Sequence, residues 1–337
     1  MDYLETPHKA EPARYDNSLL YRRCGKSGIL LPAVSLGLWK NFGGNRPLSD
    51  SRRLIHYAFD HGIVHFDLAN NYGPPPGSAE ETFGHVLATS LGAYRDEMFI
   101  STKAGYDMWE GPYGNWGSRK SLMASLDQSL RRMRLDYVDL FYSHRYDPLT
   151  PLEETLQALV DIVRSGRALY VGISRWPLEA TLFAFDYLRK HDTPCLCYQG
   201  RLNMLDRAPA KEGILSAVKH EGAGFVSFSP LAQGLLTGRY LEGIPADSRI
   251  KKETTLSADK LTPSLLAALR RLSDLAAQRG ETLAQLALRW VLDHDGITSV
   301  IVGASRIEQL ADNLGAVSAT PLSEEELKLI NDILAEQ

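Results

Sequence analysis

The chain has 337 residues, of which 44% are hydrophobic and 23% charged, and its net charge is −4. These values are typical of a soluble globular protein, and interspersed charges argue against nucleic-acid partners and membrane-binding patches. No apolar run approaches the ~20 residues that span a bilayer, residues 1–15 lack a signal-peptide core, and an odd number of cysteines argues against a disulfide framework. We therefore expect a cytoplasmic protein.

The first elements are short. Residues 1–18 have the composition of a loosely ordered N-terminal arm, and residues 20–32, with a Gly25-Lys26-Ser27-Gly28 turn, predict a small β-hairpin.

From residue 33 onward, short β-rich runs alternate with amphipathic stretches in units of about 30 residues. The predicted strands are 34–39, 64–68, 98–103, 137–143, 168–174, 195–199, 224–229 and 299–303, and the predicted helices are 49–62, 78–91, 118–134, 151–165, 177–191, 211–222, 263–279 and 282–294. This alternation fits either a (β/α)₈ TIM barrel or an open doubly wound sheet. The unbroken rhythm and the number of strands favour a single barrel domain spanning residues 1–337.

Two connections are longer than is usual between a strand and its helix, namely 104–117 and 230–262. Each follows a predicted strand, so each is expected over the carboxyl-terminal rim of the barrel, where the active sites of such barrels lie.

Several strand ends carry reactive side chains. Asp67 ends a short apolar strand and Tyr72 follows in a proline-rich loop, a pair that by itself can simply cap a loop. Lys103 and His144 end the next two strands, and strand ends converge in a barrel. An ammonium lowers a phenol pKa from its usual value of about 10, a carboxylate can hold that ammonium, and histidine can orient an acceptor oxygen. Together they form a proton-transfer set.

The chain resembles the aldo-keto reductases from about residue 20 to about residue 320. Three segments carry the likeness: Phe66-Asp67-Leu68-Ala69-Asn70-Asn71-Tyr72-Gly73, Ser101-Thr102-Lys103 and Asp139-Leu140-Phe141-Tyr142-Ser143-His144. Within the family, segments 72–78 and 229–235 are similar to the branch of bacterial L-glyceraldehyde-3-phosphate reductases, which is related to the β subunits of voltage-gated potassium channels.

The resemblance implies NADPH-dependent reduction of short aldehydes or ketones, with L-glyceraldehyde 3-phosphate or methylglyoxal as candidate substrates. Tyr72 would be the general acid, Lys103 paired with Asp67 would lower its pKa, and His144 would position the carbonyl oxygen. The alternative is an NADPH-binding regulatory or redox-sensing subunit with little turnover. We expect asparagine at the His144 position in the channel-associated relatives, so His144 favours the enzyme. Related proteins also imply a homotetramer or homo-octamer.

The resemblance further implies the cofactor contacts. Ser174 and Gln199 should hold the nicotinamide carboxamide, and the loop 229–238 should embrace the pyrophosphate. The whole expected set is Trp39, Asp67, Ser174, Gln199, Ser229, Leu231, Gln233, Gly234, Gly238, Arg249, Gly303, Ser305, Arg306, Gln309 and Asn313. The last four should receive the 2′-phosphate and adenine at a helix N-terminus, which favours phosphate as arginine does. Arg249 has a plain alternative as a solvated loop charge.

The substrate site is expected to include Trp39, Tyr72, Tyr106, Trp109, Tyr113, Trp116, His144 and Arg145, although aromatic residues in long loops can simply stabilise the loop. Arg145 would either attract an anionic substrate or form a salt bridge with Asp147. No G-x-G-x-x-G follows a strand and no His-x-His ends one, so the sequence disfavours a Rossmann dehydrogenase and predicts catalysis without a metal.

Overall fold

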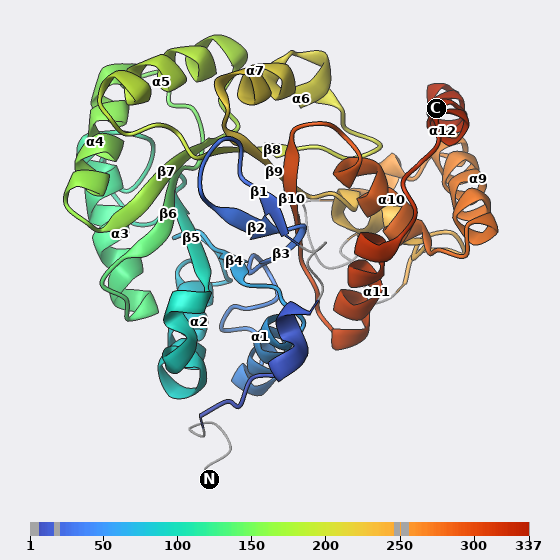
Figure 1. Ribbon diagram of the computed structural model, residues 1–337, viewed down its shortest axis with the longest axis horizontal. Coiled ribbons are helices and arrows are strands. Elements are labelled where there is room, and N and C mark those ends of the chain that lie inside the picture. The colour runs from blue at the N-terminus through green and yellow to red at the C-terminus, as the bar shows by residue number, and fades with distance from the viewer. Residues whose placement is uncertain (1–6, 17–20, 246–249, 251–255, 337) are drawn as a thin grey trace.

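Eight parallel strands close into a barrel surrounded by helices (Figure 1). The computed structural model describes residues 7–16, 21–245, 250 and 256–336. The barrel strands are β3 (Val34–Gly37), β4 (His65–Asp67), β5 (Phe99–Ala104), β6 (Val138–Ser143), β7 (Ala168–Ser174), β8 (Cys197–Arg201), β9 (Gly224–Phe228) and β10 (Ile297–Val302). They follow one another around the barrel in chain order, and β10 pairs with β3 to close it. The predicted (β/α)₈ barrel is thus confirmed, and the open-sheet alternative is excluded.

The helices lie outside the barrel (Figure 1). They are α1 (Leu48–Asp60), α2 (Ser78–Val86), α3 (Arg119–Met133), α4 (Leu152–Arg164), α5 (Leu178–Lys190), α6 (Ala208–Lys211), α7 (Ile214–Glu221), α9 (Pro263–Gln278), α10 (Leu283–Leu292), α11 (Ile307–Ser318) and α12 (Glu324–Ala335). Each predicted helix has a counterpart, with two differences. The helix predicted at 78–91 is α2 followed by a π-helical segment, η3 (Leu87–Leu91). The helix predicted at 211–222 is replaced by α6 and α7, which meet at Gly213, where a φ of 80° breaks the helical path.

Helix α3 illustrates why these segments fold where they do. The side chain of Ser118 caps its N-terminus by accepting a hydrogen bond from the Ser121 backbone amide. Its stripe of Leu122, Leu126 and Met133 is fully buried against the barrel. The apolar spacing of three and four residues thus determines which face of the helix covers the strands.

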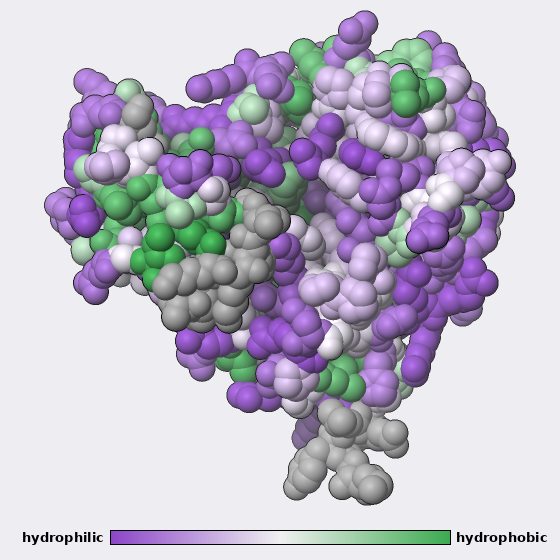
Figure 2. Space-filling model, turned by 180° about the vertical axis from the view of Figure 1, so that it is seen from behind, coloured by the Kyte–Doolittle hydropathy of each residue, from purple (hydrophilic) through white to green (hydrophobic). Residues whose placement is uncertain are grey.

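The predicted hairpin consists of β1 (Tyr21–Arg23) and β2 (Leu30–Pro32). Its turn packs against the amino-terminal ends of the strands, because the Lys26 amide donates to the Gly222 carbonyl just before β9 and the Cys24 thiol to the Leu196 carbonyl just before β8. The hairpin therefore plugs one end of the barrel and leaves the carboxyl ends of the strands open on the opposite side. Figure 2, which views the molecule from that side, shows a surface hollowed near its centre.

The N-terminal arm is more ordered than its composition predicts. His8 lies 2.8 Å from the Asp60 carboxylate on α1, and the Ala10 backbone donates to the Tyr94 hydroxyl. A 3₁₀ helix, η1 (Pro12–Tyr15), follows. The expectation of a loose arm is therefore wrong for residues 7–16, which polar contacts to α1 and its neighbours hold in place.

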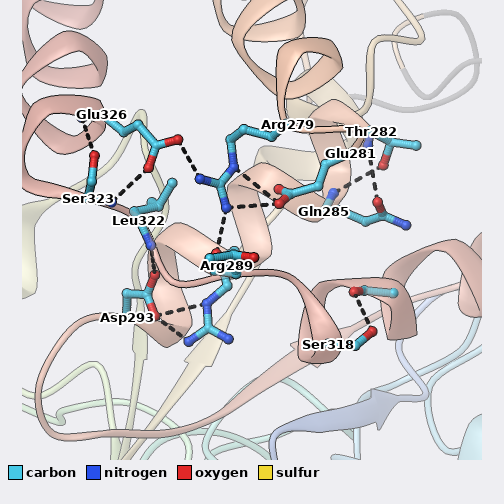
Figure 3. Close-up of polar contacts among 12 residues, drawn as sticks. Arg279, Glu281, Thr282, Gln285, Arg289, Asp293, Ser318, Leu322, Ser323 and Glu326 are labelled. Atoms are coloured by element: carbon cyan, nitrogen blue, oxygen red, sulfur yellow. Dashed lines mark hydrogen bonds and ion pairs between the residues drawn. The ribbon is translucent and has the colours of Figure 1, made fainter.

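Charged side chains connect the last helix, α12, to α10 and to the turn that joins α9 and α10 (Figure 3). Arg279 pairs with Glu281 and Glu326, and Asp293 pairs with Arg289 and accepts from the Leu322 backbone amide. These contacts hold α12 beside α9 and α10, at the periphery of the molecule (Figure 1). Within the described residues, no helix is both long and apolar enough to cross a membrane.

Candidate active site

Neighbouring strands place the reactive side chains at one end of the barrel. Strand β4 ends at Asp67, which is paired in register with Ser101 on β5. Ser101 lies two residues before Lys103 on that strand. Because side chains alternate between the two faces of a strand, Ser101 and Lys103 both point into the barrel. Lys103 is paired in register with Tyr142 on β6, and His144 follows directly after that strand. The convergence of strand ends that the sequence predicts is thus present.

Asp67, Lys103 and Tyr72 form a continuous series of contacts. The Lys103 ammonium donates to Asp67 Oδ2 at 2.5 Å and to the Leu68 carbonyl at 2.6 Å, and its Nζ lies 3.4 Å from the Tyr72 hydroxyl oxygen. Lys103 is fully buried, and its ammonium lies between the rings of Tyr72 and Tyr142, at 4.9 and 5.6 Å from their centroids. Both carboxylate and aromatic faces stabilise the cation there.

The Tyr72 pKa differs from the sequence expectation. Loss of water around the phenol raises the pKa of Tyr72 well above 10, with smaller contributions of the same sign from Asp67 and Tyr106. Burial also lowers the pKa of Lys103, while Asp67 opposes that change. The expected direction, a lowered Tyr72 pKa, is therefore not what the packed protein gives, because desolvation of the phenolate is the largest cause and acts in the opposite direction. The phenol is held protonated at neutral pH, which is the form that can donate a proton.

His144 lies beside the phenol at the mouth of the barrel. Its ring meets that of Tyr72 edge-on at 5.9 Å and that of Tyr106 at 4.7 Å, and its Nδ1 is buried without a partner among the described residues. Burial first, and then Lys103, Arg175 and Arg145, lower the pKa of His144 well below 6.5. The imidazole is therefore neutral and keeps one N–H to donate.

The loop that carries Tyr72 is held by its own backbone and by a close neighbour. The Tyr72 amide donates to the Ala69 carbonyl, and its carbonyl accepts from the Gly77 and Ala79 amides. Gly43 approaches so closely that a Cβ there would lie 2.3 Å from the Pro74 carbonyl oxygen. The phenol thus projects from a tightly packed turn.

Arg145 is engaged by the loop 104–117. Its guanidinium donates to the Gly105 carbonyl at 2.8 Å and to the Asn115 side chain at 2.7 Å, and it stacks 3.6 Å from the centre of the Trp116 ring. Asp147 instead accepts from backbone amides, including that of Gly117, and from the Thr150 hydroxyl. The alternative of a salt bridge between Arg145 and Asp147 is therefore wrong.

Of the two residues expected at the carboxamide, Ser174 ends β7, and Gln199 lies opposite it in the middle of β8. Ser174 is buried, and its Oγ has no hydrogen-bond partner among the described residues. Gln199 is buried as well and donates through Nε2 to Asp67 Oδ1 at 3.0 Å, a contact that sequence reasoning did not foresee. Because buried polar atoms are normally paired, the Ser174 hydroxyl fits a bound amide.

The loop after β9 has an unusual backbone. Ser229, Ala232 and Gln233 have positive φ values of 52°, 46° and 59°, and Gly234 and Gly238 follow at 102° and 73°. Successive residues of this kind turn several backbone amides toward one side, which suits an anion. Leu231, half-buried, belongs to the same turn. These features fit the expected pyrophosphate loop.

The N-terminus of α11 fits an adenosine phosphate. Arg306 is exposed at the N-cap, and no side chain caps the helix. Gln309 accepts from the backbone and the hydroxyl of Ser305, while Asn313 is buried on the next turn. Gly303, directly after β10, is exposed. Arg249, expected in the same subsite, lies outside the described residues.

The aromatic residues of the rim differ in surroundings. Tyr106 accepts from the Arg175 guanidinium at 2.7 Å and contacts His144, so it lines the mouth. Tyr113 is exposed with Lys120 over its ring at 5.1 Å. Trp39, two residues after the end of β3, has the Lys40 ammonium 4.6 Å from its ring. Trp109 is half-buried.

Comparison with known proteins agrees with this geometry. The chain is 54% identical over 331 residues to L-glyceraldehyde 3-phosphate reductase of Escherichia coli K12, covering 97% of this chain and 95% of the relative. It is 35% identical over 308 residues to a probable voltage-gated potassium channel subunit beta of Arabidopsis thaliana, covering 90% and 92%. Residues 33–335 match the Aldo/keto reductase family. The chain therefore belongs to the aldo/keto reductase family.

Proposed function

We propose that this oxidoreductase reduces the carbonyl group of short aldehydes and ketones with NADPH, with Tyr72 as the general acid. The observation that carries the proposal is the contact series from Asp67 through the Lys103 ammonium to the Tyr72 hydroxyl, with neutral His144 beside the phenol. A protonated phenol next to a buried cation is an arrangement for delivering a proton to a developing alkoxide.

Each side chain has a defined part in this chemistry. His144 donates its N–H to the carbonyl oxygen and orients it. Tyr72 gives its proton to that oxygen as negative charge develops there. The Lys103 ammonium, 3.4 Å away, stabilises the phenolate that remains, and Asp67 holds Lys103 in place. The buried contacts keep these groups in position before the reaction begins.

NADPH would supply the hydride when bound at this site. Ser174 and Gln199 would hold its carboxamide, the backbone of the loop 229–238 its pyrophosphate, and Arg306 its 2′-phosphate. Arg306→Ala should therefore raise the Kd for NADPH about tenfold or more, the scale of one charge-assisted contact, while the Kd for NADH stays within about twofold. Fluorescence titration with each cofactor measures both constants. Equal weakening of NADPH and NADH would contradict this assignment.

The substrate proposed is an anionic short aldehyde, L-glyceraldehyde 3-phosphate. The relative of 54% identity carries that name, and here two arginines, Arg145 and Arg175, lie near enough to His144 to lower its pKa. Positive charge at the mouth favours a phosphate-bearing substrate over a neutral one such as methylglyoxal. The ratio of kcat/KM for the two aldehydes, measured at low and high salt, tests this preference.

The decisive experiment is Tyr72→Phe. Removing the acid should lower kcat for aldehyde reduction by about a hundredfold or more, the usual contribution of a general acid, while the Kd for NADPH changes by less than about threefold. Tyr57→Phe, on α1 and stacked on His61, is the matched control and should retain full activity. Retained turnover in Tyr72→Phe would refute the role of Tyr72. Wild-type protein that binds NADPH without consuming it with any short aldehyde would favour the regulatory alternative.

A further inference from the structure

A chain of hydrogen-bonded polar side chains crosses the barrel interior beneath the active site. Ser299 Oγ lies 2.6 Å from Ser35 Oγ, Ser35 Oγ lies 2.8 Å from His65 Nδ1, and His65 Nε2 lies 3.1 Å from Ser101 Oγ. Ser101 Oγ then donates to Asp67 Oδ1 at 2.8 Å. All four of these side chains, Ser299, Ser35, His65 and Ser101, are completely buried. Side chains in the interior of such barrels are usually branched and apolar, so this polar chain calls for a function.

The direction of the chain follows from counting protons. Ser101 has one hydroxyl proton and gives it to Asp67, so in its contact with His65 the serine oxygen accepts and the imidazole Nε2–H donates. His65 Nδ1 is then unprotonated and accepts from Ser35. Ser35 has then used its own proton, so in its 2.6 Å contact with Ser299 it is the acceptor, and the Ala33 carbonyl, 3.4 Å from Ser299 Oγ, is the more distant of the two acceptors facing that hydroxyl. All the protons point toward the Asp67 carboxylate, and His65 is fixed as the Nε2–H tautomer.

The charges facing His65 keep this arrangement. Asp67 lies on the same strand and Lys103 on β5, while the Phe99 ring meets the imidazole edge-on at 5.4 Å. Burial first, together with Lys103, lowers the pKa of His65 to about 4, and Asp67 opposes this change. The ring is neutral at physiological pH. A protonated ring would donate from both nitrogens and force Ser35 to reverse its hydrogen bond.

We infer that His65 is a positioning residue for the reductase reaction, which acts by holding Ser101 as a hydrogen-bond donor to Asp67. Asp67 Oδ1 receives Ser101 and Gln199, and Oδ2 receives Lys103. With both oxygens occupied, the carboxylate cannot rotate, and the ammonium that it holds stays 3.4 Å from the Tyr72 hydroxyl. Small displacements of such groups cost large factors in rate. The inference rests on the proposed function, since it concerns the same proton donor.

Two substitutions separate the two nitrogens of the imidazole. Asparagine at position 65 reaches toward Ser35 but is too short to donate to Ser101, whereas glutamine can place an amide N–H near the Nε2 position. His65→Asn should lower kcat about tenfold and leave the KM for NADPH within about twofold, and His65→Gln should restore kcat to within about threefold of wild type. Ser101→Ala should match His65→Asn. The double variant His65→Asn/Ser101→Ala should have the same kcat as Ser101→Ala alone, because both changes remove the hydrogen bond between His65 and Ser101.

A control and a direct observation complete the test. His56→Asn removes another histidine–serine contact, that of 2.8 Å to Ser90 on the outer helices, and should lower stability without changing kcat. Nitrogen-15 NMR of the wild-type histidines should find His65 protonated at Nε2 and unprotonated at Nδ1. This measurement does not depend on whether the variants fold. An Nδ1–H tautomer, a kcat for His65→Asn within twofold of wild type, or multiplicative losses in the double variant would each overturn the inference. Absence of wild-type turnover would instead refute the proposed function and leave the tautomer to be tested by NMR.

Discussion

The buried neutral His65 should make the stability of this protein depend on pH. In the folded protein its pKa is about 4, against about 6.5 in the unfolded chain. Between these values the unfolded state binds more protons, so the stabilisation is complete above pH ~6.5 and is lost as the pH falls toward 4. Linkage gives a loss of about 2 kcal/mol between pH ~7 and pH ~5, approaching about 3 kcal/mol below the folded pKa.

Comparison with His65→Gln isolates this contribution. Glutamine does not titrate, so the variant should lose less stability on acidification, and the difference in unfolding free energy between the two proteins should shift by about 2 kcal/mol over the same range. Other histidines with lowered pKa values, such as His56 and His294, are present in both proteins and cancel. Urea unfolding followed by tryptophan fluorescence at several pH values measures the difference. A difference that stays constant with pH would refute the reasoning, because His65 would then be titrating alike in both states.

Two further predictions concern the active site. Lys103→Met leaves the buried Asp67 carboxylate without its cation and should lower the free energy of urea unfolding by about 3–5 kcal/mol. The double variant Lys103→Met/Asp67→Asn should recover most of that stability. An equal loss in the double variant would contradict the pairing. Gly43→Ala places a Cβ 2.3 Å from the Pro74 carbonyl oxygen, so it should destabilise by about 1–3 kcal/mol and lower kcat, whereas Gly28→Ala, which meets nothing within 4 Å, should change neither. Equal behaviour of these two alanine variants in thermal unfolding and turnover would show that the close approach is unimportant.

The barrel and the convergence of its reactive side chains could be predicted from sequence because they depend on local pattern. Apolar periodicity located the strands, and parallel strands in a closed barrel bring Asp67, Lys103 and His144 to one end whatever the details of packing. The π-helical end of α2 and the break at Gly213 were missed because they involve small changes in backbone path within continuous amphipathic runs. The ordered residues 7–16 were missed because their contacts to Asp60 and Tyr94 are long-range.

The partners of individual side chains were harder to predict than their positions. The position of Arg145 directly after His144 follows from the sequence, but its partners come from the fold of the loop 104–117, which no periodicity specifies. The sign of the Tyr72 pKa shift was wrong for a related reason. Sequence identifies the charged neighbour, whereas the extent of desolvation depends on the packed structure.

The alternation of a strand links the polar chain to the catalytic residues. His65 and Asp67 are two residues apart on β4, as are Ser101 and Lys103 on β5, so each pair points into the barrel at successive levels. The strand register sets Asp67 of β4 beside Ser101 of β5. Ser101, the first inward residue of its pair, can therefore donate to Asp67, the second inward residue of the pair on β4. Wherever a lysine and an aspartate point into the barrel from adjacent strands, as Lys103 and Asp67 do, the residue two positions earlier on each strand also points inward. Polar residues at those two positions, His65 and Ser101, hold the Asp67 carboxylate but require a neutral buried imidazole. The loss of stability in acid therefore follows from the same arrangement that we propose positions Tyr72 as the proton donor.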